Sequence, residues 1–156
     1  MSERSRRQVV GELGLLAAVG GVAGCLGGRR SGAGSTASGT PDVESYLASV
    51  KNYDGSPADR TRRDRVTVTV GARGNGGHLA FAPAAVEVTP GTTVVWEWTG
   101  KGGQHDVVAE HGAGFESDLV AAAGHTFEHA FEAAGPVTYY CTPHARLGMK
   151  GAVVVR

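Results

Sequence analysis

Near its C-terminus the 156-residue chain reads Tyr140-Cys141-Thr142-Pro143-His144-Ala145-Arg146-Leu147-Gly148-Met149. This run places a thiol, an imidazole and a thioether on one short loop, spaced Cys-x2-His-x4-Met. Cys141 is one of two cysteines in the chain, and Met149 is the only methionine besides Met1. Because sulfur side chains are so scarce here, their meeting in one loop indicates a metal site more than core packing. Thiolate, imidazole and thioether are the ligand types of a blue copper centre.

Such a centre takes two histidines and one cysteine in a plane, with a distant methionine on the axis. The loop supplies only His144, so a second histidine must come from another part of the chain. His105 is the best candidate, because it follows a strand-like run at residues 92–98 and a glycine-rich turn at residues 99–104. A histidine just beyond a strand is well placed to meet a loop at the same end of a β-sandwich.

The remaining histidines are expected to be structural. His125 and His129 alternate with Phe127 and Phe131, which is the period-two pattern of a strand with these four residues on one face. We therefore interpret both histidines as part of a strand surface. His78 and His111 have no metal-ligand spacing around them, so neither is a candidate ligand.

From residue 66 onward the chain shows short runs with period-two alternation, separated by glycine, proline and asparagine. This pattern is typical of a β-sandwich or barrel, and about 90 residues suffice for one such domain. The sequence therefore predicts an all-β fold. The expected strands lie at residues 66–70, 81–88, 92–98, 107–108, 126–131, 137–141 and 151–155.

On these residues the chain resembles the halocyanins, plastocyanin-like small blue copper proteins of the cupredoxin family. The resemblance covers residues 66–156 and rests on the Cys-His-Met loop, on Gly103-Gln104-His105, on residues 90–98 and on the closing residues 148–155. It implies a cupredoxin-like Greek-key β-sandwich with one type 1 copper, Cu(II)/Cu(I). The implied copper ligands are His105, Cys141, His144 and Met149.

The resemblance also implies a function. Proteins of this kind carry electrons and are not enzymes, so we expect transient contacts with membrane electron donor and acceptor proteins. We expect this chain to act as a monomer.

Three residues beside the ligands should tune the copper. Relatives usually carry asparagine after the first histidine ligand, where it links the two ligand loops, but this chain has Asp106. A carboxylate can accept a hydrogen bond from the Thr142 hydroxyl or backbone N–H, although it cannot donate one. Pro143 has no backbone N–H, which removes one donor to the Cys141 sulfur. We expect copper binding to survive and the reduction potential to change.

Residues 1–24 have the features of an export signal. Arg6-Arg7 precede a short apolar stretch, as in twin-arginine signals, and the stretch is too short and too weakly apolar to predict a membrane span. Residues 22–25, Val-Ala-Gly-Cys, resemble a lipobox. Cleavage before Cys25 and lipidation of its thiol would hold the protein on the extracytoplasmic face of the cell membrane. A plain signal peptide with an incidental cysteine and an uncleaved anchor are the alternatives.

The cysteine count agrees with this interpretation. A lipidated Cys25 leaves Cys141 without a disulfide partner, and a free thiol outside the cytosol is unusual unless something protects it. Copper coordination would protect it.

Between the signal and the sandwich we expect two short segments. Residues 25–40 form a Gly/Ser-rich linker, and residues 41–65 form a short helix with an extension. Thr40 is the predicted N-cap, with Pro41 at the first helical position. The helix should pack its apolar stripe on the edge of the domain; docking of a partner is the alternative. The stripe consists of Val43, Tyr46, Leu47 and Val50.

The charge balance gives no case for nucleic-acid binding. The chain has 15 basic and 15 acidic residues, and residues 1–24 hold three of the basic and two of the acidic ones. Removing that segment leaves 12 basic and 13 acidic residues, which is close to neutral.

Two further function classes remain as alternatives. One is an extracytoplasmic copper carrier or buffer, although carriers tend to expose several Met or Cys ligands and this loop has one of each. The other is a fragment related to multicopper oxidases or nitrite reductases. Those enzymes need a second histidine cluster, and the chain has no His-x-His. A zinc site is disfavoured by the thioether.

Overall fold

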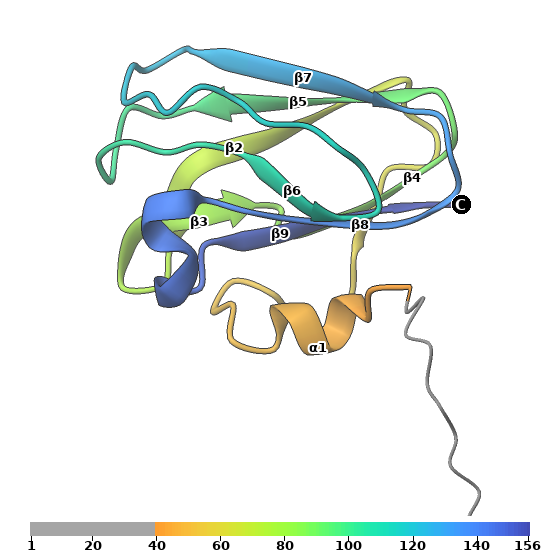
Figure 1. The fold of residues 1–156 in the computed structure, drawn as a ribbon, viewed down its shortest axis with the longest axis horizontal. Helices are drawn as coiled ribbons and strands as arrows, with labels where there is room; N and C mark the ends of the chain where they lie inside the picture. The colour runs from red at the N-terminus through yellow and green to blue at the C-terminus, as the bar shows by residue number, and fades with distance from the viewer. Residues whose placement is uncertain (1–39) are drawn as a thin grey trace, which may run out of the picture. The chain divides into compact units, whose positions relative to one another are not determined.

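Two β-sheets face each other in the computed structural model of the chain (Figure 1). The structure describes residues 40–156. The expected twin-arginine signal with Arg6 and Arg7, the lipobox Cys25 and nearly all of the expected linker therefore lie outside the described residues.

The predicted all-β sandwich is confirmed. One sheet has five strands, in the order β1 (Ala58–Asp59), β4 (Ala85–Val88), β9 (Lys150–Val155), β8 (Gly135–Tyr140) and β6 (Val108–His111). The other sheet has four strands, in the order β3 (Gly77–Ala82), β2 (Arg65–Gly74), β5 (Thr92–Trp98) and β7 (Thr126–Phe131). Pairing is parallel for β1–β4, β4–β9 and β2–β5, and antiparallel for the other neighbours.

Alternating apolar residues of both sheets fill the space between them. Trp96 of β5 is completely buried near the centre of this core. Its ring centroid lies 5.3 Å from those of Phe115 and Tyr139, 5.7 Å from that of Phe127 and 6.3 Å from that of Phe131. Aromatic rings at such separations add to the burial energy of their large apolar surfaces. Phe127 and Phe131 therefore share one face of their strand, as expected, and this face points into the core.

One expected strand is divided in two. Residues 81–88 were predicted to form a single strand, but β3 ends at Ala82 and β4 begins at Ala85, and the two lie in different sheets. Pro83 stands between them. Because proline has no N–H to donate to a ladder, a strand ends readily there and the chain crosses to the other sheet.

The register of β8 and β9 brings the predicted ligands to one end of the sandwich. Tyr140 pairs with Lys150, so Cys141 and Met149 both lie directly beyond this pair of residues. We call this end the ligand end. β5 finishes at the same end. The indole N–H of its last residue, Trp98, donates to the backbone oxygen of His105, one of the predicted ligands.

The described chain starts at the opposite end. There Gly135 of β8 pairs with Val155 of β9, and Pro41 lines one pocket together with Gly135 and Arg156. Pro41 therefore lies on the side of the domain where the chain ends, and the ligand loop lies toward the other side (Figure 1).

The helix α1 (Val43–Leu47) is shorter than the sequence predicted, and its cap differs. Asp42 is the N-cap, not Thr40, because the Asp42 carboxylate accepts the Glu44 N–H at 3.2 Å. No helix among residues 40–156 is both long and apolar enough to cross a membrane.

The helix α1 lies against the five-stranded sheet (Figure 1). Its apolar stripe packs on the domain, as expected, but on the outer face of this sheet and not at the edge of the domain. Leu47 is completely buried and Val50 nearly so. They meet Ala84, Ala85 and Ala152, whose small side chains let the helical segment approach the sheet closely. Residues 43–50 therefore form a second, smaller core on the outer face of the sheet.

Replacing Leu47 with alanine should lower the free energy of unfolding by about 2–5 kcal/mol, because it leaves a cavity in this second core. Urea unfolding followed by tryptophan fluorescence measures the change. Leu147→Ala is the matched control, because the Leu147 side chain is 56% exposed, and it should shift the free energy by less than about 0.5 kcal/mol. Equal losses in the two variants would contradict the packing.

Candidate metal centre

Three of the predicted ligands converge at the ligand end. The Nδ1 atoms of His105 and His144 lie 3.1 Å apart. The Cys141 Sγ atom lies 3.6 Å from His105 Nδ1 and 3.4 Å from His144 Nδ1. An ion within this triangle would lie about 2 Å from each corner, which is an ordinary metal–imidazole bond length. The three residues form a group with the dimensions of a trigonal metal site.

The fourth predicted ligand closes the loop that carries the other two. Met149 is completely buried and belongs to the same core cluster as Cys141. Its backbone oxygen accepts the Cys141 N–H at 3.0 Å, and its own N–H donates to the His144 oxygen at 3.2 Å. Between these residues lies the 3-10 helix η1 (Thr142–Leu147), with Pro143 in its first turn. The short helix thus fixes the spacing of all three loop ligands.

His105 is oriented by backbone groups around it. Its Nε2 atom lies 2.8 Å from the Lys101 oxygen, so Nε2 carries the N–H and Nδ1 is left to face the other ligands. Gly102 makes room for this ring: a Cβ there would lie 2.9 Å from Nε2 and 2.1 Å from the His78 oxygen. The Trp98 indole N–H donates to the His105 oxygen at 3.0 Å. The sequence did not reveal these partners, since a carbonyl acceptor has no residue signature.

Burial affects the protonation of the two buried ligands in opposite senses. It lowers the pKa of His105 below the usual histidine value, so the ring stays neutral and its Nδ1 lone pair is free. It raises the pKa of the Cys141 thiol to about 12. In the metal-free protein the thiol is therefore protonated, and metal binding must displace that proton.

The residue that departs from the family pattern links the two ligand segments. Asp106 is buried, and its Oδ1 atom accepts the Thr142 backbone N–H at 2.6 Å. This is one of the two hydrogen bonds that the sequence allowed. It joins the residue after His105 to the residue after Cys141, so the carboxylate retains the connection even though it cannot donate.

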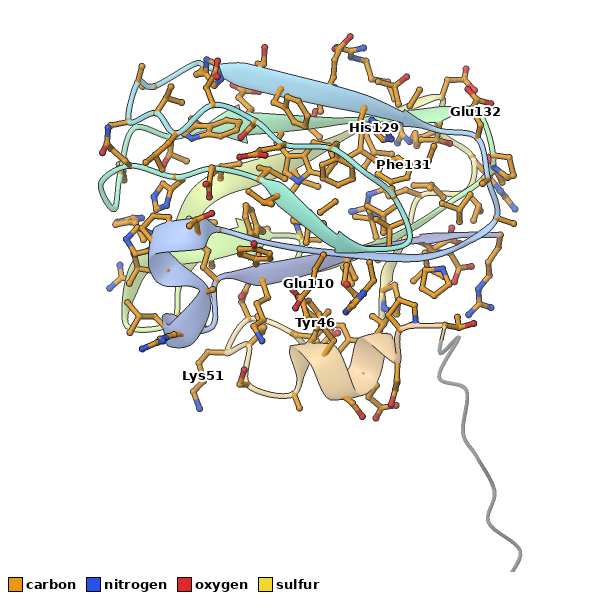
Figure 2. All side chains as sticks on the ribbon, in the orientation of Figure 1. Tyr46, Lys51, Glu110, His129, Phe131 and Glu132 are labelled. Carbon is orange, nitrogen blue, oxygen red and sulfur yellow. The ribbon has the colours of Figure 1, made fainter. Side chains whose placement is uncertain are left out.

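The other histidines lie elsewhere. His129 lies beside Phe131 on the inner side of β7, with ring centroids 4.9 Å apart (Figure 2). The His125 ring packs edge-on against Trp98, with centroids 4.8 Å apart. Both serve as packing side chains of a strand surface, as predicted.

A sequence model of the family described as copper binding proteins, plastocyanin/azurin family, matches residues 66–156. The chain belongs to this family. It is 43% identical to the halocyanin of Natronomonas pharaonis over 99% of both chains. It is 35% identical to the plastocyanin of Scenedesmus fuscus, over 58% of this chain and 99% of that protein. The solved oxidized plastocyanin of Dryopteris crassirhizoma is 26% identical, with coverage of 58% and 100% and a TM-score of 0.48.

Family and geometry together identify a blue copper electron-transfer protein with a cupredoxin fold. The donor set fits copper: two imidazole nitrogens and a thiol sulfur in one plane, with a buried thioether close by in the chain. His105, Cys141, His144 and Met149 would hold the ion. When bound, one copper supplies a one-electron couple, Cu(II)/Cu(I). The surrounding residues hold the ligands in place, exclude water from the sulfur atoms and keep the ring of His105 neutral.

Cys141→Ser should abolish the intense blue absorption of the copper-loaded protein, because that band requires the thiolate. Visible and EPR spectra after addition of one equivalent of Cu(II) measure the effect. His129→Ala is the control and should keep the colour, since His129 packs away from the site. A retained thiolate-to-copper band in Cys141→Ser would assign the sulfur ligand to another residue.

Proposed function

We propose that this protein shuttles single electrons between membrane redox partners while a lipid on Cys25 holds it at the extracytoplasmic face of the cell membrane. In this role it is a carrier and not an enzyme. The observation that carries the proposal is the unequal burial of the ligands: His105 and Cys141 are buried, whereas His144 is partly exposed. The ring edge of His144 is thus the route by which an electron reaches the surface.

The residues around His144 are suited to a short-lived contact with a partner protein. Pro143 is exposed, and the Leu147 side chain is 56% exposed on the same short helix. Leu119, 47% exposed, neighbours Val120, whose backbone pairs with His105. Leu119 and Leu147 are the large apolar residues exposed among residues 40–156, and both flank ligand-bearing segments. A few exposed apolar side chains near the ligands favour small interfaces that form and separate quickly.

The position of the first described residues supports the tether. Pro41 lies beside Gly135 at the end of the sandwich opposite the ligand end. A lipid anchor joined there would leave the His144 surface free to meet a partner.

The burial of the two sulfur atoms argues against the alternative function, a copper carrier. Cys141 and Met149 are both completely buried. A carrier that hands its ion to another protein needs ligands that the acceptor can reach, whereas a shuttle must keep its ion in both oxidation states.

Repeated redox cycling in the presence of a competing chelator separates the two roles. Copper-loaded protein is reduced and reoxidised several times beside a Cu(I) chelator, and the blue absorbance is recorded after each cycle. A shuttle should regain nearly all of its absorbance. Progressive loss of colour, with copper appearing in the chelator, would favour the carrier.

Leu147→Asp should retain its copper but slow the reduction of the protein by membrane vesicles supplied with a respiratory electron donor.

Cys25→Ala should move the protein from the membrane fraction to the soluble fraction, because the variant has no thiol to lipidate. Fractionation of cells that express the full chain measures this distribution. Cys141→Ser is the matched control, since it removes the other cysteine and should leave the protein on the membrane. If Cys25→Ala stays membrane-bound, an uncleaved N-terminal anchor replaces the lipid.

A further inference from the structure

The tight turn between β2 and β3 carries an asparagine with an unusual environment. Asn75 has a φ of 55°, in the left-handed region that asparagine tolerates better than most residues. Asn-Gly is the sequence preferred for a two-residue hairpin turn of this kind. The turn itself is therefore explained by local chemistry, but the hydrogen bonds of the Asn75 side chain are not.

The Asn75 amide joins three separate segments. Its Oδ1 atom accepts the Lys51 backbone N–H at 3.0 Å. Its Nδ2 group donates to the Leu79 oxygen at 2.8 Å and to the Gly148 oxygen at 2.9 Å. Both amide hydrogens are thus used. The Lys51 side chain points away from the domain, so only its backbone takes part (Figure 2).

Gly148 is packed closely on the same side. A Cβ at this residue would lie 3.0 Å from Asn75 Oδ1 and 3.2 Å from the Ser49 oxygen. Its φ of 92° is also one that other residues rarely adopt. Gly148 directly precedes Met149, whose backbone binds both other ligands of the loop. The hydrogen bonds therefore run from Lys51, through Asn75, to Gly148, the residue before the methionine, and Ser49 lies directly beside Gly148.

We infer that Asn75 is a positioning residue for the methionine side of the copper site, and that it transmits support from residues 49–51 to the ligand loop. In a blue copper site the Met149 thioether would be the weakest of the four ligands, so the metal would do little to fix its position and the protein must. Residues 49–51 lie outside the family match, which begins at residue 66, whereas Asn75 and Gly148 lie within it. This inference depends on the copper site and not on the proposed shuttle role, so failure of one leaves the other standing.

Two substitutions at Asn75 test the inference in the full chain. Asn75→Gly keeps the left-handed backbone and removes the side chain. Asn75→Asp keeps the shape and the acceptor for Lys51 but removes both N–H donors. Asn52→Ala is the matched control, because the Asn52 amide also donates to a backbone oxygen, that of Phe81 at 2.7 Å, without contact to the ligand loop.

Both Asn75 variants should bind Cu(II) about tenfold more weakly than the wild type, as is typical when a residue supporting a ligand is lost. Their visible band and EPR hyperfine splitting should also shift. In the copper-free protein, amide hydrogen exchange at Cys141 and Met149 should become faster. Asn52→Ala should lower the urea midpoint while copper affinity, spectra and exchange at these two amides stay as in the wild type.

A purely structural role would give a different pattern. If the Asn75 variants lose stability but keep wild-type copper affinity, spectra and amide exchange in the loop, the inference is wrong. The same conclusion follows if Asn52→Ala weakens copper binding as much as Asn75→Gly does. Should Asn75→Gly fail to fold, Asn75→Asp alone decides, because it preserves the bond to Lys51. A wild-type protein without blue colour would instead overturn the copper assignment itself.

Discussion

The copper site depends on three metal-binding atoms, from His105, Cys141 and His144, that the fold holds within 4.8 Å of one another. Hydrogen bonds to backbone groups do most of this work. The indole of Trp98 fixes the His105 backbone, the Lys101 oxygen fixes its ring, and the Cys141 N–H ties the two ends of the ligand loop together at Met149. Because Trp98 ends β5, and Cys141 and Met149 lie directly beyond β8 and β9, the sandwich itself sets much of the geometry of the site.

Burial sets the protonation states of the two buried ligands. The environment keeps His105 neutral, which is the form that binds a metal, but it keeps Cys141 protonated, which is the form that does not. The fold thus prepares one ligand fully and leaves the other to be completed by the ion. A cation of sufficient affinity for thiolate is needed to remove the proton, and soft metals meet that requirement better than hard ones.

The ligand loop could be predicted because its information is local: three ligand types at fixed spacing. The boundaries of β7 were predicted for a similar reason, since its alternation is unbroken, and those of β5 were predicted because Gly91 and Gly100 bound a run of β-branched and aromatic residues. The choice of His105 needed an argument about which strand ends meet. The division at Pro83 was missed because apolar residues continue on both sides of it, and Thr40 was chosen as the helix cap when Asp42, two residues later, was also suitable. The role of Asn75 could not be predicted, because its bond to Gly148 joins residues 73 positions apart.

The placement of the first described residues opposite the ligand end has a consequence for how such a domain would work on a surface. A tether that reaches the domain at Pro41 places the redox centre at the other end of the strands from the point of attachment. The expected Gly/Ser-rich linker at residues 25–40 would let the domain turn about that point. One tethered carrier could then present His144 to partners at different heights above the membrane without leaving it.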